Sequence, residues 1–246
     1  VVLAKQINTA GKMDFKSDIA DLSELTLKEV DLKLVNQIVP LGVMCQSGTF
    51  DYTGTLALGF GESASQKFNG ELILRNFTGG NGGYSVTNLN SKVVFKAGLD
   101  KGRTLTIDSL RAAVDLNGTV LAKQINTSGK MDFKTGIVDL KLESDELYIT
   151  PLMELLLNKK SVDLKQSDPI NNSSVANRFA LRQFKVGLDL KRLHWRDLNA
   201  TDINGLVEIN DSKYTFSPVQ MHLMGKPIKV DGFVSPAPGN DIQYDL

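Results

Sequence analysis

Hydrophobic and polar residues alternate along most of this chain, and the alternation is longest over residues 121–133. From Leu121 to Phe133 the odd positions are mainly apolar and the even positions mainly polar. A period of two is typical of a half-buried β-strand, because successive side chains point to opposite faces of a sheet. At about 3.3 Å per residue such a strand would span roughly 40 Å. The pattern therefore predicts an unusually long strand.

Most of this stretch occurs twice. Val2–Leu22 and Val120–Leu140 are identical at 17 of 21 positions, at an offset of 118 residues. A repeat constrains the whole fold, so we expect residues 1–16 to form a first copy of the long strand. The copies diverge beyond Leu22 and Leu140. Either a recent local duplication or an artefact in joining the sequence would produce such a short near-identity.

Most other segments also alternate at a period of two, which predicts a mainly β chain with one or two short helices. Leu25–Leu34 changes phase between Leu27 and Val30, as a β-bulge would cause. Thr78–Gly83, with the sequence TGGNGG, predicts a turn. A helical turn is expected around Pro40, and a short helix over Pro151–Asn158 with Thr150 as its cap.

These patterns divide the chain into three regions. Residues 1–158 form a β region that ends in the short helix, and residues 159–177 are polar and predict a loop or linker. Residues 178–246 alternate again and predict a C-terminal β region that continues the sheet.

Composition narrows the possible partners. Lys+Arg and Asp+Glu balance at 28 each, which gives no electrostatic reason to expect nucleic acid. Cys45 is the single cysteine, so no intrachain disulfide or cysteine-based metal site is expected. No apolar run has the length of a membrane-spanning helix. The chain begins inside a strand-like pattern, which predicts a fragment whose targeting segment, if any, lies outside it.

Groups suited to catalysis are few. His194 and His222 are the only histidines, and they lie in different strand-like segments. No metal-binding or nucleophile motif is present, and the Gly-rich TGGNGG lacks the lysine and following helix of a phosphate-binding loop. We therefore predict no catalytic residues, no metal site, no cofactor and no enzymatic activity.

The apolar strand face is the more informative feature, because too few helices are predicted to cover it. Such a face must pack on another sheet, close on itself or meet an apolar ligand. An ordinary β core and a ligand-lined surface have the same pattern in sequence. From the residues alone, the ordinary core is favoured.

Three stretches resemble the AsmA-like family. They are Thr127–Leu152, with its Val138-Asp139-Leu140 segment, Leu25–Leu58, with Tyr52-x-Gly54-Thr55-Leu56, and Leu206–Gly232, with Tyr214-x-Phe216-x-Pro218-Val219. This chain departs from the family in lacking an N-terminal membrane helix, and in having Gly225-Lys226 where many relatives have a glycine pair.

The resemblance implies an elongated, strongly curved antiparallel β-sheet that forms a taco-like groove with an apolar lining, related to bridge-like lipid transfer proteins. It implies a periplasmic protein of the bacterial envelope, anchored to the inner membrane by a segment outside this chain, that moves phospholipid or another acyl lipid toward the outer membrane. The resemblance does not identify envelope protein partners.

The leading hypothesis is a non-enzymatic lipid-transport module, and the alternative is a structural or interaction β scaffold with a closed, ligand-free core. A hydrolase or carbohydrate-active domain ranks third, for want of catalytic groups. The candidate lining residues lie on the apolar phase of predicted strands: Leu56, Leu58, Leu121, Ile125, Met131, Phe133, Val138, Leu140, Leu142, Val186 and Leu188.

Overall fold

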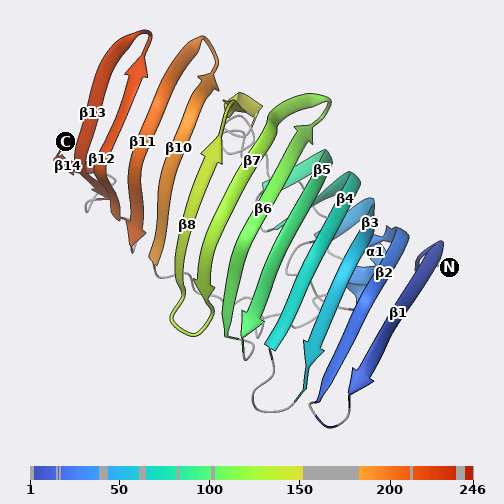
Figure 1. Ribbon diagram of the computed structural model, residues 1–246. Helices are drawn as coiled ribbons and strands as arrows, with labels where there is room; N and C mark the ends of the chain where they lie inside the picture. The colour runs from blue at the N-terminus through green and yellow to red at the C-terminus, as the bar shows by residue number, and fades with distance from the viewer. Residues whose placement is uncertain are drawn as a thin grey trace.

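The described part of the chain forms one large β-sheet and one short helix (Figure 1). The computed structural model describes residues 3–14, 16, 18–38, 44–60, 65–81, 84–100, 103–151, 183–210, 213–236 and 242–245. Fourteen strands belong to the sheet within these ranges, and most neighbours pair antiparallel. The prediction of a mainly β chain built on an antiparallel sheet is confirmed.

The first eight strands follow one another across the sheet in chain order, each antiparallel to the next. They are β1 (Gln6–Asp14), β2 (Ile19–Asp31), β3 (Met44–Gly59), β4 (Ser65–Asn81), β5 (Tyr84–Asp100), β6 (Thr104–Leu116), β7 (Thr119–Asp132) and β8 (Ile137–Ser144). Several are long, and β4 and β5 have 17 residues each. The long strands arise because the alternation continues through them with few breaks.

The remaining strands extend the same sheet. They are β9 (Leu147–Tyr148), β10 (Gln183–Trp195), β11 (Leu198–Asn210), β12 (Lys213–Leu223), β13 (Lys226–Pro236) and β14 (Ile242–Asp245). β10 pairs parallel with β8, and β10 to β14 then continue antiparallel. The short β9 also pairs parallel with β10 and meets β7 through the pair Ala122–Leu147. Residues on both sides of position 160 therefore share one sheet.

Bulges lie next to one another across β2, β4 and β5. The register shifts between Leu27 and Val30, as the change of phase in the sequence predicted, and Glu29 there has φ 48°. Asn76 in β4 and Asn88 in β5 have φ 51° and 53°. A bulge adds a residue to one strand and bends it. The neighbouring bulges therefore bend several strands at a similar level.

Each of these three backbone amides donates to a side chain on a neighbouring strand. Glu29 N donates to Asp51 Oδ1 at 2.7 Å, and Asn76 N to Asn90 Oδ1 at 2.9 Å. Asn88 N donates to Thr78 Oγ1 at 3.2 Å. The bulges interrupt the ladder, so these side chains supply hydrogen bonds that a regular strand would make through its backbone.

The duplicated stretch folds into two similar hairpins. Lys12 pairs with Asp21 in β1–β2, and their counterparts Lys130 and Asp139 pair in β7–β8. The registers then separate, because β1–β2 shifts between Ala10 and Lys12 while β7–β8 runs regularly from Ile125 to Asp132. The divergence begins where β2 and β8 cease to be alike in sequence.

Two expectations about connections need correction. The stretch Thr78–Gly83 is not simply a turn, because β4 continues through Asn81. A Cβ atom on Gly79 would lie 2.3 Å from Met44 O, so this glycine permits close approach of β3. The helical turn expected near Pro40 is α1 (Leu32–Ile38), and residues 39–43 lie outside the described residues.

Asp31 explains where α1 begins. Its Oδ1 accepts hydrogen bonds from Lys33 N at 2.8 Å and Leu34 N at 3.2 Å, which is N-cap geometry. The helix expected over residues 151–158 and the linker expected over residues 159–177 lie almost wholly outside the described residues. Among the residues that are described, no helix is long and apolar enough to cross a membrane.

The tightest packing lies toward the C-terminal half of the sheet. A cluster of buried apolar residues joins β7, β9, β10, β11 and β12. Its members are Ala122, Leu147, Leu190, Ala200, Ile203 and Val219. Partly buried residues such as Leu188, Val207 and Phe216 pack against this cluster, so it continues into the apolar face described next.

Candidate functional site

The register of the sheet aligns nine apolar residues and two glycines, one from each of eleven strands, into one continuous row, here called the apolar row. Each member lies directly opposite the next on the neighbouring strand. From β2 to β13 the members are Leu22, Leu56, Phe68, Ala97, Ile107, Gly129, Leu140, Val186, Val207, Phe216 and Gly232. Residues paired in this way share one face of the sheet.

All eleven members of the apolar row are half-buried. This is unusual for apolar residues in the middle of a large sheet, where a second layer normally buries them. The row crosses the strands, and neighbouring strands lie about 4.8 Å apart, so it extends over roughly 48 Å. The apolar row is therefore a long, partly accessible hydrocarbon surface.

A second line of cross-strand pairs runs beside the apolar row and is more deeply buried; we call it the inner row. Both rows lie on the same face of the sheet. Their positions differ by four residues on seven of the nine strands, and by five on β2 and β6, where a bulge between the two rows adds one residue. The inner row comprises Leu27, Tyr52, Leu72, Val93, Ala112, Ile125, Ser144, Leu190 and Ile203. The apolar face thus becomes more enclosed from the apolar row toward the inner row.

Tyr52 shapes this face through two glycines on adjacent strands. Gly54 and Gly70 pair across β3 and β4, and a Cβ atom on Gly70 would lie 2.9 Å from the Tyr52 ring. The Tyr52 hydroxyl lies 3.1 Å from Thr55 O and 3.3 Å from Asn69 O, so it can donate to either. The ring thus lies over both glycines, and its hydroxyl is satisfied within an otherwise apolar surface.

Most of the lining residues predicted from sequence lie on this face. Leu56, Leu140 and Val186 belong to the apolar row, and Ile125 to the inner row. The others lie two residues from the apolar row, on one side or the other: Leu58, Met131, Val138, Leu142 and Leu188. Of these, Val138 is 0% exposed and offers no surface to a ligand.

Leu121 and Phe133 differ from this placement. The β6–β7 register shifts between the pairs Ala112–Ile125 and Val114–Ala122, so Ala122 and not Leu121 joins the buried cluster. Leu121 is only 3% exposed and lies apart from that cluster. Phe133 follows the end of β7, where its backbone N donates to Arg103 O. The alternation read from Leu121 to Phe133 is therefore interrupted near its start.

Sequence reasoning missed several members of the apolar row, among them Phe68, Ala97, Ile107, Val207 and Phe216. Each lies in a segment of alternating residues. Their alignment depends on the register between neighbouring strands, however, and alternation within one strand does not specify that register.

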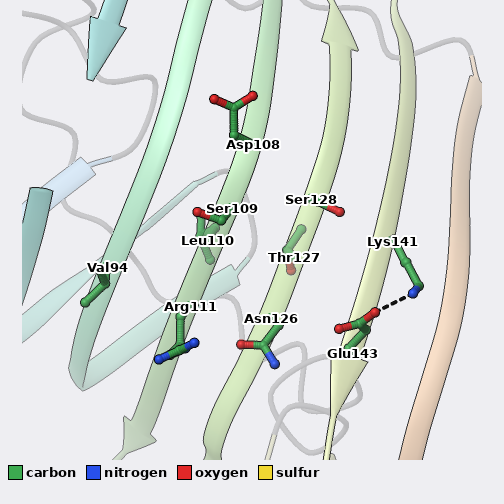
Figure 2. A pocket seen from close by; sticks show the side chains of 10 residues that line it. All are labelled: Val94, Asp108, Ser109, Leu110, Arg111, Asn126, Thr127, Ser128, Lys141 and Glu143. Atoms are coloured by element: carbon green, nitrogen blue, oxygen red, sulfur yellow. Dashed lines mark ion pairs between the residues drawn. The ribbon is translucent and has the colours of Figure 1, made fainter. Parts of the chain in front are cut away.

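The opposite face of the sheet is polar. Thr53, Glu71, Arg111, Asn126, Glu143, Asp189 and Asn204 follow one another across it, interrupted by Val94. Figure 2 shows a hollow on this side, lined by residues from β5 to β8. It lies at a bulge of β6, where Asp108 and Ser109 together lie opposite the single β7 residue Ser128, between the pairs Ile107–Gly129 and Leu110–Thr127.

The polar hollow carries charges of both signs. Lys141 forms an ion pair with Glu143, and this hydrogen bond raises the pKa of Lys141. Asp108 lies 4.0 Å from Lys96 Nζ. In the lining Arg111 and Lys141 balance Asp108 and Glu143, so the side chains do not favour a ligand of one charge.

His194 has more partners than its sequence context indicated. Its Nδ1 lies 2.6 Å from Asn199 Oδ1, its Nε2 lies 3.0 Å from Glu146 Oε1, and its ring stacks on Tyr148 at 4.4 Å. Hydrogen bonds from Tyr148 and then His194 lower the pKa of the Glu146 carboxyl. These contacts attach β9 to β10 and to the start of β11, which is a structural role.

Asp51 forms a second polar cluster, at the β2 bulge. It is 7% exposed, accepts from Glu29 N and Arg75 Nη2 at 2.7 and 2.8 Å, and lies 3.9 Å from Lys28 Nζ. The hydrogen bond from Arg75 is the main cause that lowers the pKa of Asp51. The cluster stabilises the bulge, since each of these partners lies on a neighbouring strand or at the bulge itself.

No group of three or more His, Cys, Asp or Glu residues in the described part of the chain is arranged to hold a metal ion. Burial raises the pKa of the Cys45 thiol, which favours its unreactive protonated form. The arrangement is best suited to holding apolar groups against the half-buried row. Comparison of the chain with protein-family models, curated proteins and solved structures gives no match.

Proposed function

We propose that this protein is a non-enzymatic lipid-binding module that holds acyl chains against the apolar row. One observation carries the proposal: nine apolar residues and two glycines, one from each of eleven strands, lie opposite one another across the sheet, and all of them are half-buried. An acyl chain lying along this row would remove hydrocarbon from water on both sides. Headgroups would remain in solvent at the rim.

The row is long enough to contact the number of methylene groups that stable lipid binding needs. Removing one methylene group from water contributes about 0.8 kcal/mol, so tight binding requires many methylenes in contact at once. A row of roughly 48 Å, from strands about 4.8 Å apart, offers such contact along a chain. It would also allow a lipid to slide between equivalent positions, as transport requires.

The resemblance to the AsmA-like family supports the same proposal and adds a cellular setting. In that setting the protein is periplasmic, attached to the inner membrane by a segment outside this chain, and carries phospholipid toward the outer membrane. The half-buried apolar row fits the lining that the resemblance implies.

The second candidate is a β scaffold with a closed core. The buried cluster around Ala122, Leu190 and Ile203 favours it, because there the same face is packed and leaves no room for a ligand. The two candidates make different predictions for the part of the sheet from β3 to β6, which would be open to a ligand in the first and closed in the second. There the apolar row is half-buried and the buried cluster is absent.

Lipid occupancy separates these candidates. Native mass spectrometry of the purified chain, followed by extraction, should reveal bound phospholipid. Leu56→Glu places a charge in the apolar row and should lower occupancy at least several-fold. Thr55→Glu is the matched control, because Thr55 is exposed on the opposite face of the same strand, and it should leave occupancy unchanged.

Circular dichroism must show that both variants are folded. The lipid proposal fails if no phospholipid co-purifies with the chain or binds when vesicles are supplied. It also fails if folded Leu56→Glu and Thr55→Glu retain equal occupancy. Either result would leave the closed scaffold as the better description.

A further inference from the structure

Two neighbouring hairpin tips carry exposed apolar side chains. The turn between β10 and β11 is flanked by the pair Trp195 and Leu198, which are 38% and 39% exposed. The turn between β12 and β13 begins at Met224, which is 72% exposed, more than any other large hydrophobic residue in the described part of the chain. Met224 N donates to Asn199 O at 3.1 Å, so the two tips lie side by side (Figure 1).

The backbone at both tips is unfavourable for the residues that occupy it. Positive φ is uncommon for residues other than glycine, and Asn and Asp tolerate it best. Eight non-glycine residues in the described ranges have positive φ, and five of them are Asn or Asp. Of the other three, Glu29 lies at the β2 bulge, whereas Arg196 and Met224 lie at the two tips, with φ 53° and 51°.

The turn between β6 and β7 shows the usual solution. Its central residues Asn117 and Gly118 have φ 54° and 77°, and Met224 and Gly225 have φ 51° and 78°. Positive φ at both central residues is type I′ geometry, for which Asn-Gly is a preferred pair. Met224 therefore has the backbone of Asn117 without a side chain suited to it. Strained residues of this kind cluster at functional sites, where another interaction compensates for the lost stability.

We propose that the two tips dock this protein onto the surface of a phospholipid bilayer, with Trp195, Leu198 and Met224 entering the interface. The indole ring is amphipathic, and Trp is enriched where membranes meet water. Arg196 and Lys226 flank the apolar residues, and among the described residues neither forms an ion pair. They outnumber the one acid in the two turns, Asp197, and suit anionic headgroups.

A bilayer suits these tips better than a protein surface does. Stable protein interfaces take about 20–30 residues from each partner, whereas here three apolar side chains lie at the ends of two hairpins. The Arg196 amide donates to Thr150 Oγ1 at 2.6 Å, which fixes the β10–β11 tip. A few side chains on a fixed tip can enter a membrane interface, because binding there scales with the apolar area buried.

The tips also continue the apolar face of the sheet. Trp195 and Leu198 lie two residues beyond Leu193 and Ala200, which pair with each other at the buried cluster. Side chains two residues apart on a strand lie on the same face. Docking would therefore bring this face to the membrane, but it does not depend on lipid being held in the apolar row.

Trp195 is the single tryptophan of the chain, so its fluorescence reports on this site alone. Vesicles of phosphatidylcholine and phosphatidylglycerol in equal parts should carry the whole chain upward in a flotation gradient. They should also shift the Trp195 emission to shorter wavelength, and lipids brominated on their acyl chains should quench it. Without vesicles, acrylamide should quench the same emission, because Trp195 is exposed.

Two matched variants test the role of Met224. Met224→Asp should weaken vesicle binding at least ten-fold, because a charge replaces the most exposed apolar side chain. Asn117→Asp places the same charge at the same position of the β6–β7 turn, and should bind as the wild type does. Met224→Asn should also weaken binding while raising the midpoint of urea denaturation, because Asn tolerates this φ better than Met. Loss of binding in that variant is then not caused by unfolding.

Several results would overturn the proposal: no flotation with vesicles, no shift of the Trp195 emission, or equal binding by Met224→Asp and Asn117→Asp. A lower urea midpoint in Met224→Asn would remove the argument from strain and overturn it too. Shielding of Trp195 from acrylamide in the free chain would show that another part of the protein covers the tips.

Leu56→Glu separates docking from lipid binding in the apolar row. This variant should lose lipid occupancy and still float with vesicles, because Leu56 lies far from the two tips along the sheet. If the folded variant no longer floats, vesicle binding belongs to the apolar row and the docking proposal fails. If the wild type floats but holds no lipid, docking stands and the proposed lipid function fails.

Discussion

At the scale of single residues, glycines determine how closely the strands approach. A Cβ atom on Gly54 would lie 2.2 Å from Asn69 O and 2.6 Å from the Cα of Gly70, both of which are backbone atoms. Neither atom can move without displacing β4. A Cβ atom on Gly98 would meet nothing nearer than 3.7 Å. The two glycines are therefore under different constraints, although both lie in strands.

This difference predicts opposite effects of the same substitution. Gly54→Ala should lower the free energy of unfolding by about 1–3 kcal/mol, the usual cost of forcing extra volume into a packed site. Gly98→Ala should leave it unchanged or raise it by up to about 1 kcal/mol, because alanine restricts the unfolded chain. Urea denaturation of the two variants measures both effects. Equal free energies would contradict the close approach at Gly54.

At the scale of elements, the bulges show how a strand can bend and remain hydrogen-bonded. The change of phase between Leu27 and Val30 is visible in sequence, but the carboxylate that receives the Glu29 amide comes from the next strand. Arg75, one strand further, binds the same carboxylate. Three strands thus meet at Asp51, so the bulge is a property of the sheet and not of β2 alone.

Asp51 should contribute to the loss of stability in acid. Its folded-state pKa is lowered, mainly by the hydrogen bond from Arg75. The contribution is therefore present above the unfolded value of about 3.9 and is lost as pH falls through the folded value. Asp51→Asn should lower the free energy of unfolding by about 1–3 kcal/mol at neutral pH, because a charged hydrogen bond is weakened. It should also reduce the loss of that free energy as the pH falls through the acid range.

Urea denaturation across the acid range tests this expectation. Asp21→Asn serves as the control, because Asp21 is exposed on β2 and lies opposite Lys12 and Ala57. In the control the free energy of unfolding should depend on pH as it does in the wild type. The same wild-type dependence in Asp51→Asn would show that the contacts of Asp51 do not control the acid transition.

At the scale of the whole molecule, the sheet is extended in one direction. Thirteen strands follow one another along the main path of the sheet, and at about 4.8 Å per step they span roughly 58 Å before twist is considered. Figure 1 shows this long, twisted ladder, with β1 and β14 at opposite ends. Such a shape leaves a large fraction of the apolar face near solvent.

Small-angle scattering should detect this shape. A compact protein of 246 residues would have a radius of gyration of about 18 Å. The extended sheet should give a clearly larger value in a monomeric sample, together with an asymmetric distance distribution. A value near 18 Å would mean that the sheet closes on itself in solution.

The sequence by itself determined the kind of structure. Alternation at a period of two specified strands, the change of phase between Leu27 and Val30 specified a bulge, and the repeat specified two similar hairpins. These features depend on residues close together in the chain, where side-chain direction follows from backbone geometry alone. Most of the predicted lining residues, such as Leu56 and Val186, lie on the apolar face for the same reason.

The tertiary structure decided which apolar residues share a surface and how exposed that surface is. Leu56 aligns with Phe68 and Ala97 through pairing between strands, and the register shift near Ala122 brings Ala122, and not the predicted lining residue Leu121, into the buried cluster. The parallel pairing of β8 with β10 was likewise absent from the local pattern. Register and burial depend on contacts between distant segments, which alternation within one strand does not specify.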